Sequence, residues 1–256
     1  MIFDTHAHYD DEAFDEDREV ILSSLKSNNI SYVTNIGASI ASSRMSLELA
    51  KKNNFIFAAI GVHPNEVDEL NEEKIQWLKD NSSHPKVVAI GEIGLDYYWN
   101  EPSPDIQKKW FERQLDLARE VKLPVVIHSR DAAKDTMDIM KYKKAEELGG
   151  VIHCYSYHKE QAREYLDMGF YFGIGGVITF NNAKKLREVV EYLPMDKIVL
   201  ETDAPYLSPV PNRGKRNSSL NLPYVVKTIA EIKGISEKEV MDLTRINAKA
   251  LYRLEV

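Results

Sequence analysis

Short runs rich in valine, isoleucine and phenylalanine recur along this chain of 256 residues, with longer amphipathic segments between them. This alternation is typical of βα units, in which helices connect the parallel strands of one sheet. Several runs are apolar throughout, as expected of strands that are covered on both faces. Eight runs fit this description: residues 2–6, 32–36, 55–62, 87–92, 125–128, 151–153, 170–174 and 198–203.

The segments between these runs predict helices. Over residues 106–121, Ile106, Trp110 and Leu117 fall on one side, and charged residues fill the opposite face. Ser236 followed by Glu239 is a capping-box pattern, which indicates a further helix near the end of the chain. Eight strands alternating with helices in about 250 residues predict an α/β fold, a TIM (β/α)8 barrel. We expect a single domain over residues 1–256 with extra C-terminal helices.

Charge and composition exclude some classes of protein. The 33 basic and 40 acidic residues give a net charge of -7, which argues against a protein that coats nucleic acid with its whole surface. The basic loop at residues 213–216 is either simply solvated or a local phosphate contact. No apolar stretch is long enough for a membrane helix, and the N-terminus lacks a signal-peptide pattern. Cys154 is the only cysteine, so we expect no internal disulfide and a cytoplasmic location.

Residue types that bind metals stand at the ends of the predicted strands. In a TIM barrel, the C-terminal strand ends converge on one mouth, where active sites are built. His6 and His8 are two positions apart, so in an extended strand both imidazoles leave the same face. The other strand-end groups are His63, Glu92, His128, His153 and Asp203. Because scattered surface histidines would not follow strand ends in this way, the pattern predicts a metal site.

The number of these groups favours two metal ions. His6, His8, His128 and His153 with the carboxylates of Glu92 and Asp203 exceed what one tetrahedral zinc requires. We expect Glu92 to bridge two divalent cations, with His6, His8 and Asp203 nearer one ion and His128 and His153 nearer the other. The mixed nitrogen and oxygen donors suit Zn, Mn, Fe or Co and do not exclude Mg. Two such ions can share a hydroxide that attacks a phosphodiester.

Individual residues have more specific predicted roles. Asp203 is expected to be both a metal ligand and a proton acceptor. Glu201 should point to the same side one layer deeper, where it supports the ligands rather than binding an ion. His63 is a candidate for binding a substrate phosphate or for acting as general acid, with a structural histidine as the alternative. Arg130 suits either a bidentate phosphate contact or a salt bridge at a helix start.

Three aromatic residues, Tyr97, Tyr98 and Trp99, follow the predicted strand that carries Glu92. Their rings are suited to stacking on unpaired nucleobases. They are equally suited to packing as a lid, and from the sequence we slightly favour plain packing.

Taken in order, the strand-end segments resemble a known family. They are residues 5–8 (THAH), 61–64 (GVHP), 91–96 (GEIGLD), 128–130 (HSR), 153–156 (HCYS) and 200–207 (LETDAPYL). These segments are similar to the successive motifs of TatD-type metal-dependent deoxyribonucleases, which belong to the amidohydrolase-like superfamily of TIM barrels. The resemblance implies a divalent-metal-dependent hydrolase of ester bonds, with DNA as substrate, bound as a single strand or at 3′ ends. It maps the metal ligands onto His6, His8, Glu92, His128, His153 and Asp203.

Two positions depart from the family pattern. Tyr157 stands where the sixth motif usually continues with Gly, and residues 218–221 read Ser-Ser-Leu-Asn where members more often carry a Pro and an Ala before the Asn. Neither departure removes a ligand, so both bear on substrate preference. The alternative functions are an amide or ester hydrolase or lactonase on the same barrel, and a non-catalytic nucleic-acid-binding protein. The sequence predicts no membrane partner, and it contains no pattern from which a protein partner could be inferred.

Overall fold

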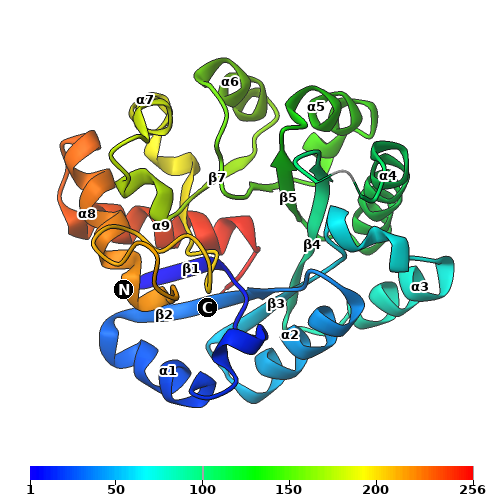
Figure 1. Ribbon diagram of the computed structural model, residues 1–256, viewed down its shortest axis with the longest axis horizontal. Helices are drawn as coiled ribbons and strands as arrows, with labels where there is room; N and C mark the ends of the chain where they lie inside the picture. The colour runs from blue at the N-terminus through cyan, green and yellow to red at the C-terminus, as the bar shows by residue number, and fades with distance from the viewer. Residues whose placement is uncertain (100, 256) are drawn as a thin grey trace. The chain divides into compact units, whose positions relative to one another are not determined.

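The computed structural model describes residues 1–99 and 101–255. Its strands form one eight-stranded sheet in which each strand neighbours the next in sequence order (Figure 1). The strands are β1 Ile2–Ala7, β2 Ile30–Ile36, β3 Ile56–Ile60, β4 Val87–Asp96, β5 Val125–Arg130, β6 Gly150–Ile152, β7 Tyr171–Ile174 and β8 Ile198–Leu200. Pairs such as β4 with β5 and β7 with β8 are parallel. The predicted α/β fold, a TIM-like barrel of eight parallel strands, is confirmed.

Helices follow the strands and cover their apolar side chains. They are α1 Arg18–Leu25, α2 Ile40–Lys52, α3 Glu72–Asn81, α4 Pro104–Val121, α5 Ala133–Tyr142, α6 Lys159–Asp167, α7 Lys184–Tyr192, α8 Leu222–Lys233 and α9 Glu237–Leu251. The predicted capping box is present, because Ser236 and Glu239 bond each other's backbone N–H groups at the start of α9. None of the helices described within residues 1–99 and 101–255 is long and apolar enough to cross a membrane.

Several predicted strand ends are wrong: β3 ends at Ile60 rather than at residue 62, and β5 continues to Arg130 rather than ending at residue 128. β4 does not stop at Glu92 but continues to Asp96, because residues 93–96 pair with β5 up to Arg130. β6 ends at Ile152 and β8 at Leu200, so His153 and Asp203 lie in the segments that follow. The backbone of Asp203 has φ 56°, a left-handed conformation that an extended strand excludes.

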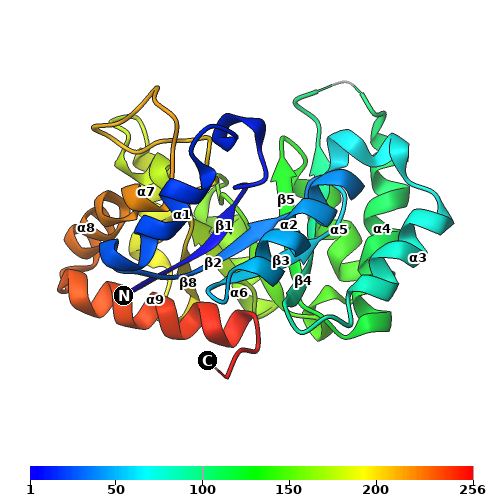
Figure 2. The ribbon, with the colours of Figure 1, turned by 90° about the horizontal axis from the view of Figure 1, so that it is seen from below.

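The contacts between residues divide the chain into two compact units. The first unit comprises residues 1–35, 154–167 and 171–256 and contains β1, β7, β8 and most of β2. Here the segment after β8 lies beside β1, since the Asp203 N–H donates to the His6 carbonyl at 2.9 Å. The last helix, α9, packs across β1 and β8 (Figure 2). This arrangement places the segment after β8 beside the end of β1.

The second unit comprises residues 36–153 and 168–170 and contains β3, β4, β5 and β6. α2 packs on β3 and α4 packs on β4. Two buried glutamines of α4 join this helix to the ends of the strands. Gln114 bonds both backbone groups of Val62, and Gln107 bonds both those of Asp96. The C-terminal ends of β3 and β4, which carry predicted site residues, are therefore anchored to a long helix.

Candidate metal centre

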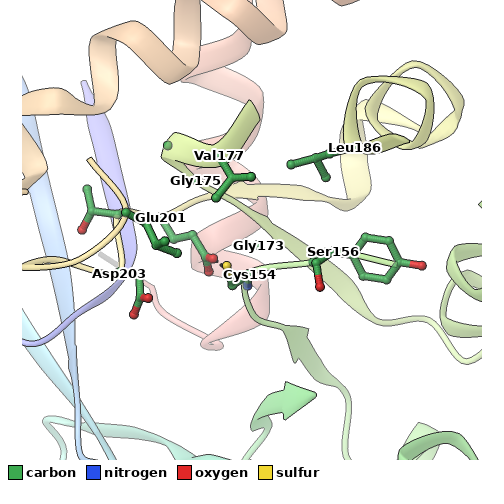
Figure 3. A pocket seen from close by; sticks show the side chains of 12 residues that line it. Cys154, Ser156, Gly173, Gly175, Val177, Leu186, Glu201 and Asp203 are labelled. Atoms are coloured by element: carbon green, nitrogen blue, oxygen red, sulfur yellow. Dashed lines mark hydrogen bonds between the residues drawn. The ribbon is translucent and has the colours of Figure 1, made fainter. Parts of the chain in front are cut away.

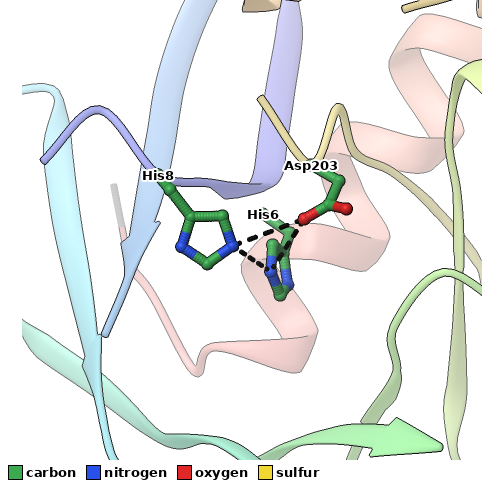
Figure 4. A group of neighbouring side chains, drawn as sticks. All are labelled: His6, His8 and Asp203. Atoms are coloured by element: carbon green, nitrogen blue, oxygen red, sulfur yellow. Dashed lines mark hydrogen bonds and ion pairs between the residues drawn. The ribbon is translucent and has the colours of Figure 1, made fainter. Parts of the chain in front are cut away.

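The first cluster of metal-binding side chains lies in the first unit, where β1 ends beside the segment after β8. His6, His8 and Asp203 turn toward one another (Figure 4). The Nε2 atoms of the two histidines are 3.1 Å apart, and Oδ1 of Asp203 lies 3.3 Å from His8 Nε2 and 3.6 Å from His6 Nε2. The His6 side chain is 1% exposed, whereas those of His8 and Asp203 are 12% and 18% exposed. The cluster is therefore open to solvent on one side.

Local backbone geometry explains this convergence. His6 lies in β1 and His8 directly follows the end of the strand; because they are two positions apart, both rings turn to the same side, as predicted. Asp203 reaches them because its left-handed backbone turns the chain back over the end of β1. Aspartate is one of the few residues that adopt this conformation at low cost.

A buried carboxylate supports this cluster from below. Asp4 is fully buried, and its Oδ1 accepts hydrogen bonds from the backbone N–H groups of His6 and Thr202 at 3.3 and 3.1 Å. Its Oδ2 accepts from the hydroxyls of Thr202 and Ser219 at 2.8 and 2.6 Å. Burial raises the pKa of Asp4 to about 7, although these hydrogen bonds act to lower it. Asp4 thus ties the end of β1 to the segment after β8.

The second cluster lies in the second unit and is centred on Glu92. Its Oε1 lies 2.7 Å from Nδ1 of His128, 3.6 Å from Nε2 of His153 and 3.9 Å from Nε2 of His63. Glu92 and His153 are buried, whereas His63 and His128 are partly exposed. Three histidine rings from different strand ends thus surround one carboxylate.

Asp96 belongs to this second cluster and was missed from the sequence. Its Oδ2 lies 3.2 Å from Nε2 of His128, so the ring of His128 is held between two carboxylates. A signal was available, because Glu92 and Asp96 are four positions apart and side chains alternate along a strand. A strand that ended at Glu92, as predicted, would not have carried Asp96 on the same face.

Charge is balanced around His128. Burial by itself would lower the pKa of His128, but hydrogen bonds to Asp96 and Glu92 raise it above the ordinary histidine value. Burial would likewise raise the pKa of Asp96, yet the hydrogen bond with His128 lowers it. The two carboxylates therefore favour a positive charge between them, either a protonated His128 or, with His128 neutral, a bound cation.

His63 contributes to this cluster while capping a turn. Its Nδ1 accepts a hydrogen bond from the backbone N–H of Asn65 at 3.2 Å, at the start of the 3-10 turn Pro64–Glu69. This bond directs Nε2 toward Glu92. His63 can therefore stabilise the turn through Nδ1 and take part in the site through Nε2.

Glu201 lines a pocket in the first unit together with Asp203 and Cys154 (Figure 3). Its Oε1 accepts a hydrogen bond from the backbone N–H of Cys154 at 2.7 Å. Gly173 makes room for this carboxylate, since a Cβ on Gly173 would lie 2.1 Å from Oε2 of Glu201. Glu201 thus fixes the backbone of the residue that follows His153.

The two predicted anion contacts have different surroundings. The guanidinium of Arg130 lies 3.7 Å from the centroid of the exposed Tyr98 ring and not in a salt bridge at a helix start. In the basic loop at residues 213–216, Arg216 pairs with Asp17, and Arg213 lies over the ring of Phe180. Arg216 is thus occupied by a carboxylate, which favours the solvated interpretation of its part of the loop.

The donor sets fit divalent cations. Groups of nitrogen and oxygen atoms that lie within 4.8 Å of one another come from His6, His8 and Asp203 in one unit and from His63, Glu92 and His128 in the other. Imidazole and carboxylate together are typical ligands of Zn, Mn, Fe and Co. The assignment of individual ligands stays a prediction.

Comparison with known proteins agrees with the motifs. The family described as TatD related DNase matches residues 3–253. The metal-dependent hydrolase YabD of Bacillus subtilis is 44% identical over 99% of this chain and 100% of its own length. The 3'-5' ssDNA/RNA exonuclease TatD of a Rahnella species is 34% identical over 94% of each chain. The crystal structure of YjjV, a TatD homologue from Escherichia coli K12, has a TM-score of 0.93 and 28% identity, covering 99% and 98% of the two chains.

These matches span nearly the whole chain and include all of the strand-end motifs. The structural agreement extends over the same length. The chain therefore belongs to the TatD family of metal-dependent hydrolases.

Proposed function

We propose that this protein is a metal-dependent nuclease that hydrolyses phosphodiester bonds of single-stranded DNA from the 3′ end. The observation that carries the proposal is the pair of histidine–carboxylate clusters at strand ends, in a chain of the TatD family. The exonuclease of the Rahnella species, 34% identical over 94% of the chain, supports the choice of substrate.

Each cluster has the donors to hold one divalent cation. His6, His8 and Asp203 would hold one ion, and Glu92, His128 and His153 are the candidates for the other. Bound divalent cations supply Lewis acidity, which acidifies water and offsets the negative charge of a phosphodiester. The bridging position of Glu92 stays a prediction from the sequence.

The residues of the chain have complementary tasks in this proposal. Asp203 is partly exposed and accepts the proton of the attacking water. His63, with its Nε2 on the open side of the second cluster, binds the phosphate or donates a proton to the leaving oxygen. Arg130 binds a phosphate oxygen. Glu201 keeps the backbone after His153 in place. A cytoplasmic location likewise stays a prediction.

A metal-by-substrate matrix tests the proposal. Metal-stripped protein is supplied with Mg2+, Mn2+, Zn2+, Co2+ or Fe2+ singly and incubated with 5′- and 3′-labelled single- and double-stranded DNA, RNA and a lactone. We expect mononucleotide release from the 3′ end of single-stranded DNA only with added metal. Metal analysis should give two ions per chain.

Matched histidine variants locate the activity. His128→Gln should lower kcat/KM about 100-fold or more, since it removes a group between two carboxylates. His84→Gln is the control, because His84 precedes β4 and, among the described residues, its ring bonds only the nearby Lys86 N–H. Cleavage by chelated protein, or turnover of the lactone with no phosphodiester cleaved, would contradict the proposal.

A further inference from the structure

The segment after β4 presents two large aromatic rings to solvent. Tyr98 and Trp99 are 55% and 54% exposed, and their ring centroids are 5.0 Å apart with an angle of 87° between the planes. Tyr97, by contrast, donates its hydroxyl to Asp135. The expectation of plain packing is therefore wrong for Tyr98 and Trp99. Adjacent exposed aromatic rings mark a binding surface, because their apolar area is not covered by the protein itself.

Arg130 completes this surface. Its guanidinium lies 3.7 Å from the centroid of the Tyr98 ring, in a cation–π contact. Within residues 1–99 and 101–255, no carboxylate forms an ion pair with it. A planar cation without an acidic partner attracts an anionic ligand and offers a flat face for stacking. We call Tyr98, Trp99 and Arg130 the aromatic platform.

The aromatic platform is joined to the second metal-binding cluster. The backbone N–H of Tyr98 donates to Oδ1 of Asp96 at 3.0 Å, and Oδ2 of the same carboxylate lies 3.2 Å from Nε2 of His128. The Tyr97 N–H donates to the Arg130 carbonyl at 2.9 Å. Asp96 and Arg130 are also partners across the β4–β5 pairing. The aromatic platform is thus held at the ends of two strands, with Arg130 two positions after the candidate metal ligand His128.

We infer that the aromatic platform binds an unpaired nucleobase of the single-stranded substrate, next to the phosphodiester that is cleaved. Aromatic rings and guanidinium planes stack on any base, whereas a base within a duplex already has both faces covered. The positive charge of Arg130 complements the adjacent phosphate. The inference rests on the proposed nuclease function and specifies why the substrate would be single-stranded.

Binding measurements test this role separately from catalysis. Metal-loaded protein is titrated with a fluorescent single-stranded hexadeoxynucleotide whose linkages are phosphorothioates, and with an abasic oligomer of the same length. Trp99→Ala should weaken binding of the base-containing oligomer about 5- to 150-fold, the effect of one lost stacking contact. Tyr98→Ala should act in the same direction. Binding of the abasic oligomer should change much less.

Tyr142→Ala is the matched control. Tyr142 is 77% exposed at the C-terminal end of α5, and a helix that follows a parallel strand ends on the opposite side of the sheet from that strand's C-terminal end. Its replacement should leave binding of both oligomers unchanged. In assays with cleavable DNA, Trp99→Ala should raise KM more than it lowers kcat.

Equal affinity of wild-type protein and Trp99→Ala for the base-containing oligomer would overturn the inference. An equal loss of affinity for the base-containing and abasic oligomers would also overturn it, because the rings would then contact the backbone alone. If the wild-type protein binds bases through the aromatic platform but cleaves no DNA with any metal, the proposed nuclease function fails while the aromatic platform stands. If DNA is cleaved but Trp99→Ala binds the base-containing oligomer as tightly as the wild-type protein does, the nuclease function stands and the role of the aromatic platform fails.

Discussion

Replacing Ser219 by alanine should destabilise the protein through a carboxylate that is distant in sequence. Ser219 lies in the Ser-Ser-Leu-Asn segment that departs from the family pattern, and its side chain is fully buried. Its hydroxyl donates to Oδ2 of Asp4 at 2.6 Å and lies 2.8 Å from the hydroxyl of Tyr9. The replacement therefore removes one hydrogen bond to a buried carboxylate and one partner of a buried phenol.

The size of the effect follows from these two contacts. A hydrogen bond to a charged group contributes about 1.5–3 kcal/mol, and a neutral one roughly 1 kcal/mol. The Tyr9 hydroxyl keeps the backbone N–H of residue 219 as a donor, at 2.9 Å, so its loss is partial. We expect the free energy of unfolding to fall by about 3 kcal/mol, which lowers Tm by roughly 6–12 °C in a chain of this size.

Thermal unfolding of metal-stripped protein measures this change, with Ser218→Ala as the control. Within the described residues, Ser218 forms hydrogen bonds through its backbone: its N–H donates to the Asn217 side chain, and its carbonyl accepts from the Asn221 N–H. Its replacement should therefore alter stability by no more than about 0.5 kcal/mol. Equal Tm values for the two variants would refute the reasoning, because Asp4 would then not depend on the Ser219 hydroxyl.

The deficit of Ser219→Ala should also depend on pH. Burial raises the pKa of Asp4 from 3.8 to about 7, so this carboxyl contributes stability at low pH that is lost as pH rises through 7. Ser219 lowers this pKa, and its removal raises it further. The variant should thus lose more stability at pH 8, where Asp4 ionises in the wild type, than at pH 5. A larger deficit at pH 5 would contradict the assignment.

Three further perturbations test other parts of the structure. Gly173→Ala should displace the Glu201 carboxylate, because the new Cβ would lie 2.1 Å from Oε2. We expect roughly 10-fold lower DNA-cleavage activity from this variant. In protein that already carries Glu201→Ala, the additional loss should be much smaller. Chelation should lower Tm, since an ion present at 100 times its Kd stabilises by about 2.7 kcal/mol, and calorimetry before and after metal restoration measures the shift. Arg216→Ala should leave the rate of DNA cleavage unchanged, because this arginine pairs with Asp17; a slower rate would assign the loop a substrate contact.

Local patterns in the sequence were sufficient for the fold class and for most of the candidate site. The alternation of apolar runs and amphipathic segments depends on backbone periodicities of 2 and 3.6 residues, which act over a few neighbouring residues. For the same reason His6, in β1, and His8, just after it, could be placed on one side of the chain. The strand ends were less certain, because β4 continues beyond Glu92 only through its pairing with β5.

The tertiary structure decided which distant residues meet. Ser219 and Asp4 are 215 positions apart, and no local pattern could pair them. The contact of Arg130 with Tyr98 depends on how the segment after β4 folds over the end of β5. Asp96 ends the 91–96 motif, but it lies beside His128 because residues 93–96 continue β4 and pair with β5. The sequence by itself thus determined the family and the order of the strands, because the motifs and the backbone periodicities that reveal them are local patterns. The contacts that the carboxylates, hydroxyls and rings make around the candidate site depend on long-range packing, and only the folded chain revealed them.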